Sequence, residues 1–244
     1  MQFRLVTYNI HKCIGGMDRK YRVERVIETL SNYAADIVLL QEVDDGVPRS
    51  RHHRQVDLIG DGLGLNHRAF QGNVSLRIGQ YGNAILSRFP LSDICDIELT
   101  VPFKKRRRAI AARCALRTEH HSRTLLVINM HLGLAGFERT IQLRRLLACD
   151  VLKHIHPSTG VIAAGDFNDV WGKLGKRLLE PFGFVAASGP VKTFPAFRPM
   201  RALDRVYYRG ELNLLNCFAS RSSIARRASD HLPIVVDFEI PIEE

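Results

Sequence analysis

The sequence predicts an α/β fold in which two β-sheets pack face to face and helices cover their outer faces. Short apolar, β-branched runs outnumber the helical patterns, and many neighbouring runs are separated only by short turns. This arrangement disfavours a simple alternation of strands and helices and favours two packed sheets. No repeat, low-complexity linker or composition boundary divides the 244 residues, so we expect a single domain over residues 1–244.

The predicted strands are short runs rich in Val, Ile, Leu and Ala that end in turns or polar residues. They are residues 3–8, 36–41, 81–87, 110–117, 124–130, 161–165, 203–208 and 234–238.

Three segments have the spacing of amphipathic helices. In 21–33, apolar residues recur at helical intervals at Val23, Val26, Ile27 and Leu30. A shorter helix is predicted over 55–63. A long helix is predicted over 136–155, where one apolar stripe is interrupted by an arginine and the helix ends before Pro157.

The charge of the chain points to anionic partners. Its 35 Lys and Arg against 25 Asp and Glu give a formal net charge of +10. A positive field of this size attracts nucleic acid, an acidic membrane surface or a phosphorylated small molecule, and does not choose among them.

Cysteine usage and hydropathy bear on the compartment. The five cysteines are widely spaced and contain no CxxC pair, which disfavours a disulfide framework or a structural zinc site and fits a reducing compartment. No segment has the roughly 18 consecutive apolar residues that span a bilayer, and the first residues read as a strand rather than a signal peptide. We therefore expect a cytoplasmic protein, and, because no coiled coil or exposed apolar stripe stands out, a monomer.

Four apolar strands run directly into residues that bind metals or move protons. The strand before Asn9, the strand before Glu42, the strand before His131 and the strand before Asp166 all end in this way. Asn168 lies two residues beyond Asp166, so in a continuing strand both side chains point to one face. Taken singly, each residue also fits a turn or a buried histidine, and only their joint occurrence favours a site.

Two further segments near the C-terminus supply an acid/base pair. Asp204 lies within an apolar run, and Asp230 and His231 directly precede the last predicted strand. His231 is a candidate base, and Asp204 is its candidate partner because a carboxylate on one ring nitrogen fixes the tautomer. His131 is a candidate for holding a phosphate oxygen or protonating a leaving group.

The carboxylates and amides favour magnesium over zinc. Mg²⁺ prefers hard oxygen ligands, whereas zinc more often recruits His and Cys. The oxygen ligands available are Glu42, Asp166 and Asp230, with the amides of Asn9 and Asn168. We expect Mg²⁺ as the cofactor, with Mn²⁺ as the alternative.

Taken together, these segments resemble the endonuclease/exonuclease/phosphatase superfamily, which includes deoxyribonuclease I, abasic-site endonucleases, neutral sphingomyelinases and inositol polyphosphate 5-phosphatases. The matching segments follow the family's order along nearly the whole chain and are Tyr8–Ile10, Gln41–Val43, Tyr81–Ser87, Asn129–His131, Gly165–Asn168, Leu203–Val206 and Ser229–Pro233. The combination of Gly-Asp-Phe-Asn with Ser-Asp-His-Leu-Pro is specific. The small bacterial and sphingomyelinase-like members are the most similar.

The resemblance implies a four-layered α/β/β/α sandwich of two mixed sheets, with the active site at one edge. It implies that Glu42 binds the metal, with Asn9 close by and Asp230 on a second ion. It implies that Asp166 and Asn168 position the water or the phosphate. It also implies that Asp204 with His231, aided by His131, forms the catalytic acid/base group.

The expected substrate contacts come from two sources. Tyr81 and Asn83 match a segment that lies beside the active-site edge in the family, and Arg205 follows Asp204 in a matching motif. Two basic runs, 104–108 and 49–54, are each as consistent with a solvated turn as with a binding surface. The second run follows Glu42 closely, so Arg49 and Arg51 are the better candidates for contacting substrate.

These observations predict a Mg²⁺-dependent phosphoesterase that hydrolyses nucleic-acid phosphodiester bonds by metal-assisted attack of water. The alternative is a phospholipid or phosphoinositide phosphoesterase, which the sphingomyelinase-like segment and attraction to anionic lipid favour. Phe194, Phe197 and Met200 are candidates for touching a membrane, but packing in the core or at the rim is the stronger interpretation of these three side chains. A second alternative is a non-catalytic phosphate-binding module, which would bind without metal-stimulated turnover.

Overall fold

The computed structural model describes residues 1–117 and 121–241 and contains two six-stranded mixed β-sheets. The first has the order β11-β12-β1-β2-β4-β3 and the second β5-β6-β7-β8-β10-β9. The strands of the first sheet are β1 (Gln2–Asn9), β2 (Ile37–Asp45), β3 (His67–Ser75), β4 (Gln80–Ser87), β11 (Asn213–Ala219) and β12 (Ile234–Glu239). Those of the second are β5 (Leu91–Glu98), β6 (Arg108–Arg117), β7 (Ser122–His131), β8 (Gly160–Asp166), β9 (Val185–Ala186) and β10 (Asp204–Arg209).

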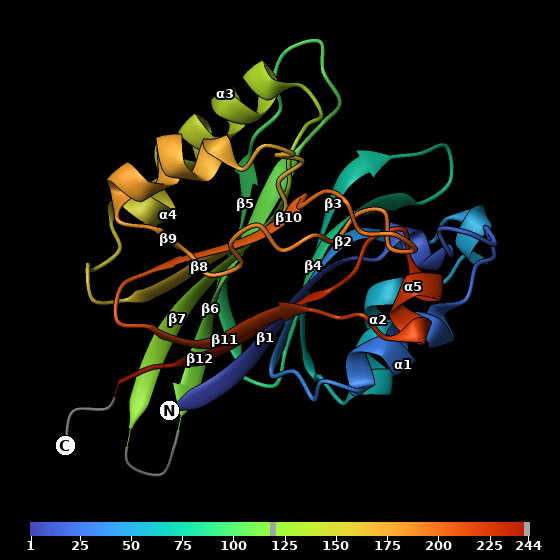
Figure 1. Cartoon of the computed structure of the whole chain (residues 1–244), viewed down its shortest axis with the longest axis horizontal. Helices are drawn as coiled ribbons and strands as arrows, with labels where there is room; N and C mark the ends of the chain where they lie inside the picture. Colours follow the sequence, from blue (N-terminus) through green and yellow to red (C-terminus); the bar gives the residue numbers. More distant parts are fainter. Residues whose placement is uncertain (118–120, 242–244) are drawn as a thin grey trace.

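The helices cover the two outer faces, so the predicted four-layered α/β/β/α sandwich is confirmed. Figure 1 shows α1, α2 and α5 on one side of the paired sheets and α3 and α4 on the other. The bounds are α1 (Val23–Ser31), α2 (Gln55–Leu63), α3 (Gly136–Leu147), α4 (Asp150–Lys153) and α5 (Ser223–Ala228), with short helical turns η1 (His11–Cys13), η2 (Pro48–Ser50), η3 (Gly175–Leu179) and η4 (Glu180–Phe182).

Three apolar cores hold the layers together. The central core lies between the sheets and joins residues such as Leu39 and Val127. A second core packs Leu143 and Leu146 of α3 against the second sheet, and a third packs α1 and α2 against the first. Alternate residues of each strand therefore serve either the central core or an outer one, as the two-residue period of a strand requires.

Each sheet contains one parallel pair, and this sets the position of the site. β1 pairs with β2, and β7 pairs with β8, both in parallel, while the remaining pairs are antiparallel. Parallel neighbours end at the same edge of a sheet. Asn9, His131 and Asp166 are the last residues of β1, β7 and β8, and Glu42 lies at a bulge in the carboxyl-terminal half of β2.

The prediction of one long helix over 136–155 was wrong. The chain leaves the helix at Cys149, whose backbone is extended with φ −73° and ψ 149°, and a four-residue helix follows. Leu146 and Leu152 both pack into the outer core of the second sheet. In a continuous helix they would lie about 120° apart around the axis, so the break allows both to be buried. No helix in the described parts of the chain is both long enough and apolar enough to cross a bilayer.

Candidate active site

A β-bulge presents Glu42 in the carboxyl-terminal half of β2. The register between β2 and β4 shifts between Gln41 and Val43, so Glu42 has no partner in the ladder. Its φ of 57° lies in the left-handed region, which a non-glycine residue adopts at a cost. The bulge turns the carboxylate out of the strand, and its Oε1 lies 4.0 Å from Nδ1 of His131 on the other sheet.

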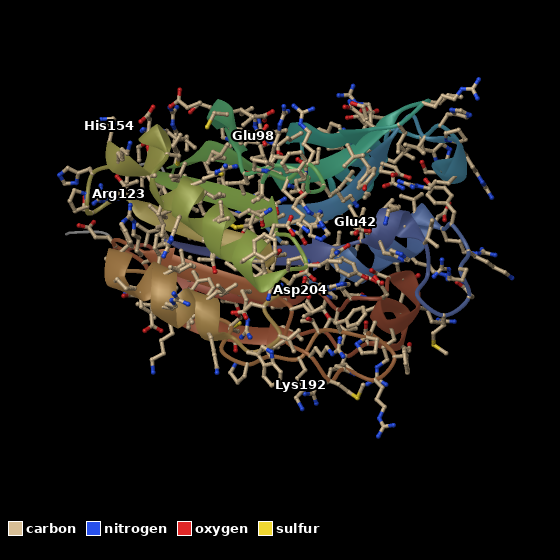
Figure 2. All side chains as sticks on the ribbon, turned by 90° about the horizontal axis from the view of Figure 1, so that it is seen from above. Glu42, Glu98, Arg123, His154, Lys192 and Asp204 are labelled. Carbon is tan, nitrogen blue, oxygen red and sulfur yellow. The ribbon has the colours of Figure 1, made fainter. Side chains whose placement is uncertain are left out.

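Asp166 lies at the centre of the cluster. Its Oδ2 accepts a hydrogen bond from Asn9 Nδ2 at 3.1 Å and lies 3.5 Å from His131 Nε2 and 3.8 Å from His231 Nε2. These partners come from β1, β7 and the segment before β12. The structure thus brings together residues from both sheets that are far apart in sequence, and in Figure 2 the labelled Glu42 and Asp204 both lie in the central part of the molecule.

Gly165 allows β8 to deliver Asp166 at this position. Its φ is 136°, and a Cβ atom there would lie 1.9 Å from the carbonyl oxygen of Met130 on the neighbouring strand. Only glycine avoids this clash. Beyond it, Asn168 donates its backbone N–H to Asp166 Oδ1 at 2.9 Å and its side-chain amide to the Leu132 carbonyl at 3.0 Å. These bonds fix both the carboxylate and the loop.

Asp204 and His231 form a buried ion pair. His231 Nδ1 donates to Asp204 Oδ2 at 2.8 Å, and Thr193 Oγ1 donates to the same oxygen. The segment before β12 is fixed by Ser229, whose hydroxyl donates to the Asn9 carbonyl at 2.7 Å and accepts the His231 N–H at 3.2 Å. The ring is therefore oriented with Nε2 towards Asp166.

The pKa shifts of the buried groups follow from these contacts. Burial opposes the charged ring of His231, but Asp204 and Asp166 outweigh it and raise its pKa. Burial raises the pKa of Asp166. Burial and the nearby Arg107 lower the pKa of His131, which favours its neutral ring. The expectation that His231 acts as a base requires a neutral ring, whereas the ion pair favours the imidazolium.

Glu42 is ionised and already faces a positive charge. Burial opposes ionisation, but the charge and hydrogen bond of Lys12 outweigh it and lower the Glu42 pKa to about 2. Lys12 Nζ forms an ion pair with Glu42 Oε2. Asp230, which is 31% exposed at its side chain, lies 3.8 Å from His11 Nδ1 through Oδ1. These two carboxylates therefore lie nearer the surface than the Asp166 centre.

Among the described residues, one compact group of possible metal ligands lies around Asp166. Asp166, Asp204 and His231 offer ligand atoms that all lie within 4.8 Å of one another. However, Asp204 Oδ2 is already bonded to His231 and Thr193. The group that the described residues offer for a divalent cation is therefore the one around Asp166, whereas Glu42 is occupied by its ion pair with Lys12.

The sequence analysis missed two cations of the site, Lys12 and Arg107. Arg107 is 6% exposed, and its Nε has no hydrogen-bond partner. Burial lowers its pKa, and Asp166 and Glu42 oppose that fall from nearby. Arg107 belongs to the basic run 104–108, which was the less favoured of the two runs. Nothing in the sequence distinguishes Arg107 from the other basic residues of this run.

The predicted substrate contacts are dispersed. Tyr81 lies beside the site, with Lys12, Arg49 and Lys105 at 5.8, 5.2 and 5.1 Å from its ring centroid. Arg49 is also held by a bidentate pair with Asp44, at 2.7 and 2.9 Å.

Of the other three predicted contacts, Asn83 pairs with Gln41 across β2 and β4, next to Glu42, whereas Arg51 and Arg205 have their contacts elsewhere. Asn83 is buried and donates to the Arg108 carbonyl at 3.0 Å, so it supports the strand that follows Arg107. Arg51 lies 5.9 Å from the ring centroid of Tyr21, in a different hollow. Arg205 is buried and donates to the carbonyls of Gly189 and Asp169, behind the loop that carries exposed Trp171. The roles of these three in substrate binding stay predictions.

Comparison with known proteins places this geometry in a family. The protein YbhP of Escherichia coli (strain K12) is 27% identical over 98% of this chain and 96% of its own length. The crystal structure of an endonuclease/exonuclease/phosphatase from Beutenbergia cavernae is similar, with a TM-score of 0.80 and 21% identity over 98% of this chain and 72% of that chain. ANGEL2, described as a 2′,3′-cyclic phosphatase in complex with adenosine-2′,3′-vanadate, has a TM-score of 0.73 at 16% identity over 98% of this chain and 95% of that one. Members of the family are generally phosphoesterases. Because residues 6–231 match its sequence pattern, the chain belongs to the endonuclease/exonuclease/phosphatase family.

Proposed function

We propose that this chain is a Mg²⁺-dependent phosphodiesterase that hydrolyses nucleic-acid phosphodiester bonds. The observation that carries the proposal is the position of Asp166 Oδ2, which lies 3.1 Å from Asn9, 3.5 Å from His131 and 3.8 Å from His231. A carboxylate surrounded by an amide donor and two imidazoles can orient a water molecule and exchange protons during attack on phosphorus.

The oxygen atoms of Glu42, Asn9 and Asp230 are ligands of the kind that a hard divalent cation prefers. Glu42 is ionised and pairs with the ammonium group of Lys12, so a positive charge already lies where the proposal places the cation. Carboxylate and amide oxygens are the ligands that Mg²⁺ prefers, with Mn²⁺ as the alternative. In the proposal Glu42 holds the cation with Asn9 close by, and Asp230 serves a second ion. The cation supplies charge neutralisation at the phosphoryl oxygens.

The side chains divide the proton transfers between them. Asp166, whose pKa is raised by burial, accepts a proton from the attacking water as the new phosphorus–oxygen bond forms. His231, whose pKa is raised by Asp204, donates the proton on Nε2 to the leaving oxygen as the scissile phosphorus–oxygen bond breaks. The separation of 3.8 Å between these groups lets the proton return to His231. Asn168 holds Asp166 through its backbone N–H.

Arg107 and His131 are assigned to the phosphoryl oxygens. Arg107 is a buried cation without an ion pair among the described residues, and its Nε has no hydrogen-bond partner. A buried charge left unpaired is costly unless a ligand compensates it. A phosphate group would supply that compensation and would accept the bidentate bonds that guanidinium groups form.

The charge of the chain favours nucleic acid among phosphoester substrates. The net charge is +10, and three cations gather around Tyr81 beside the site, namely Lys12, Arg49 and Lys105. The fold shared with ANGEL2, which was solved with an adenosine compound, is consistent with this choice.

The test is a substrate panel with and without metal. The chain is incubated with Mg²⁺, Mn²⁺ or EDTA and with bis(p-nitrophenyl) phosphate, plasmid DNA, abasic-site duplex, RNA or phospholipid vesicles, and an Asp166→Ala variant is the control. We expect metal-dependent cleavage of nucleic acid that falls steeply with salt. Metal-independent cleavage, or equal activity of Asp166→Ala, contradicts the proposal. Metal-independent binding without any turnover supports the phosphate-binding module instead.

A phospholipid phosphoesterase is the second candidate, and exposed apolar side chains favour it. Phe197 and Met200 are 56% and 57% exposed on the segment beside Thr193, and Trp171 is 80% exposed on the loop after Asn168. Phe194 packs against the His231 ring, with centroids 5.0 Å apart. Preferential hydrolysis of vesicles in the panel, dependent on lipid charge, would select this function.

The compartment and the oligomeric state belong to the proposal as well. All five cysteines are free in the structure, which supports a reducing compartment such as the cytoplasm. We propose that the chain acts as a monomer, because its site is assembled from the two sheets of a single chain.

A further inference from the structure

A hollow outside the active site is lined mainly by cations. It has a volume of about 620 Å³ and lies between α1, α5 and the turn that follows η2. The basic residues that line it are Lys20, Arg22, Arg25, Arg51 and Arg227, against two carboxylates, Glu24 and Glu28. Figure 1 shows α5 beside α1 on the outer side of the first sheet.

Most of these cations have no carboxylate partner. Arg25 pairs with Asp18 at 2.7 Å. Within the described parts of the chain, no ion pair joins Lys20, Arg22, Arg51 or Arg227 to an acidic residue. These four cations repel one another, and Glu24 and Glu28, the two carboxylates that line the hollow, form no ion pair with any of them in the described parts of the chain. A bound polyanion would remove this repulsion.

One wall of the hollow is aromatic. The Tyr21 hydroxyl and His53 Nδ1 are hydrogen-bonded at 2.9 Å, and their rings lie 5.7 Å apart. The Arg51 guanidinium lies 5.9 Å from the centroid of the Tyr21 ring. Aromatic faces among basic side chains are typical of surfaces that bind single-stranded nucleic acid.

The turn around η2 connects the hollow to the active site. Arg49 and Arg51 lie two residues apart but point to different places. Arg49 lies over Tyr81, beside Glu42 and Lys12, whereas Arg51 lies over Tyr21 in the hollow. The left-handed backbone of Arg51, with φ 57°, reverses the chain between them. The turn thus places Arg51 at the hollow, without an ion pair in the described parts of the chain, while Arg49, paired with Asp44, lies beside the site.

A second connection runs through the loop before α1. A Cβ atom on Gly16 would lie 2.8 Å from the Asp230 Cα atom, and one on Gly15 would lie 2.7 Å from the Arg227 carbonyl oxygen. Only close backbone packing produces such distances. The loop that carries Lys12 at the site is therefore packed directly against the segment that carries both Asp230 and Arg227.

The geometry points to a remote phosphate subsite in this hollow, which binds the sugar-phosphate strand of a nucleic acid whose scissile bond lies at Asp166. This inference rests on the proposed function and extends it to a substrate several nucleotides long. A nucleic-acid strand carries one negative charge at each phosphate, which matches the unpaired cations that line the hollow. A membrane is the poorer partner, because the surface is concave and none of its lining residues is among the exposed large apolar side chains of the described chain.

The test uses a triple variant and a matched control. Lys20→Gln, Arg22→Gln and Arg227→Gln remove three exposed charges from the hollow, and Arg144→Gln, Lys153→Gln and Arg177→Gln remove three exposed charges from the helices on the opposite face. Binding to a labelled single-stranded 20-mer, as DNA and as RNA, is measured by anisotropy in EDTA across a series of KCl concentrations. Thermal unfolding confirms that each variant folds, and the single substitutions Arg22→Gln and Arg227→Gln provide a second measurement.

The hollow variant should bind the 20-mer about tenfold more weakly than the control, and its salt slope should fall by about 2, since each lost contact with a single strand removes roughly 0.7. A trinucleotide should bind both variants alike. With Mg²⁺, the hollow variant should lose kcat/KM on the 20-mer and keep its rate on bis(p-nitrophenyl) phosphate. Equal binding of the 20-mer by both triple variants overturns the inference. Weaker binding in EDTA without hydrolysis of any substrate would leave the subsite standing and overturn the proposed function.

Discussion

Asn9 at the end of β1 donates a hydrogen bond to Asp166 at the end of β8, at 3.1 Å, and this bond joins the two sheets across 157 positions of sequence. Asn9 Oδ1 also accepts the backbone N–H of His11 at 3.1 Å, so the amide is held at both ends. The central carboxylate of the site is thus held by a residue of the opposite sheet. The active site exists only when the two sheets are packed.

Removal of the Asn9 amide should weaken both stability and turnover. In Asn9→Ala, buried Asp166 loses a donor, which should lower the free energy of unfolding by about 1–2 kcal/mol. Hydrolysis of bis(p-nitrophenyl) phosphate should fall about tenfold. Urea denaturation and steady-state kinetics measure the two effects. Exposed Asn213→Ala is the control and should change neither; an unchanged rate in Asn9→Ala would exclude the proposed role.

The charge of Asp204 should be essential for turnover. In Asp204→Asn, His231 loses the anion that raises its pKa, so the ring carries less charge at neutral pH and donates its proton poorly. We expect kcat to fall about 10³-fold, within the range of acid/base groups. Asp150→Asn, at a side chain 87% exposed, is the matched control. A fall of less than threefold in Asp204→Asn would show that the pair does not transfer the proton.

Replacement of Arg107 should lower turnover without lowering the stability of the fold. Arg107→Gln removes a buried cation without an ion pair, so the free energy of unfolding should stay equal or rise by about 1 kcal/mol. Meanwhile kcat/KM should fall about 100-fold, because a charged donor to the phosphoryl oxygens is lost. The neighbouring Arg106, 48% exposed, gives the control Arg106→Gln. Equal kinetics of the two variants would remove Arg107 from the site.

Gly165 should tolerate no side chain. In Gly165→Ala the new Cβ would meet the Met130 carbonyl oxygen at 1.9 Å on a backbone with φ 136°. The free energy of unfolding should fall by roughly 3 kcal/mol or more. At Gly64, with φ 67° and open space around it, alanine should cost only about 1 kcal/mol. Thermal or urea unfolding compares the two, and an equal loss at both positions would contradict the packing argument.

The strands that the sequence analysis missed are the four edges of the two sheets. They are β3 and β11 in the first sheet and β5 and β9 in the second. Edge strands mix charged and exposed residues with apolar ones, because one side of the strand meets solvent rather than a neighbour. Their sequences therefore lack the continuous apolar run that identified all of the inner strands.

The site divides in a similar way. Glu42 and Asp166 were predictable because each directly follows a continuous apolar run in the sequence, although the structure includes both in their strands. Lys12 and Arg107 were not, since both lie in irregular segments whose position depends on the packing of the two sheets. The break at Cys149 was equally hidden, because only the tertiary positions of Leu146 and Leu152 require it.

The central claim is that one site, assembled from both sheets, hydrolyses phosphodiesters with a proton supplied by His231. The most direct measurement is the rate of bis(p-nitrophenyl) phosphate hydrolysis with Mg²⁺ by the unaltered chain and by His231→Ala, with circular dichroism confirming that both are folded. The account predicts measurable turnover by the unaltered chain and a loss of about 100-fold or more in the variant. A folded His231→Ala variant that retains a near-normal rate would contradict it.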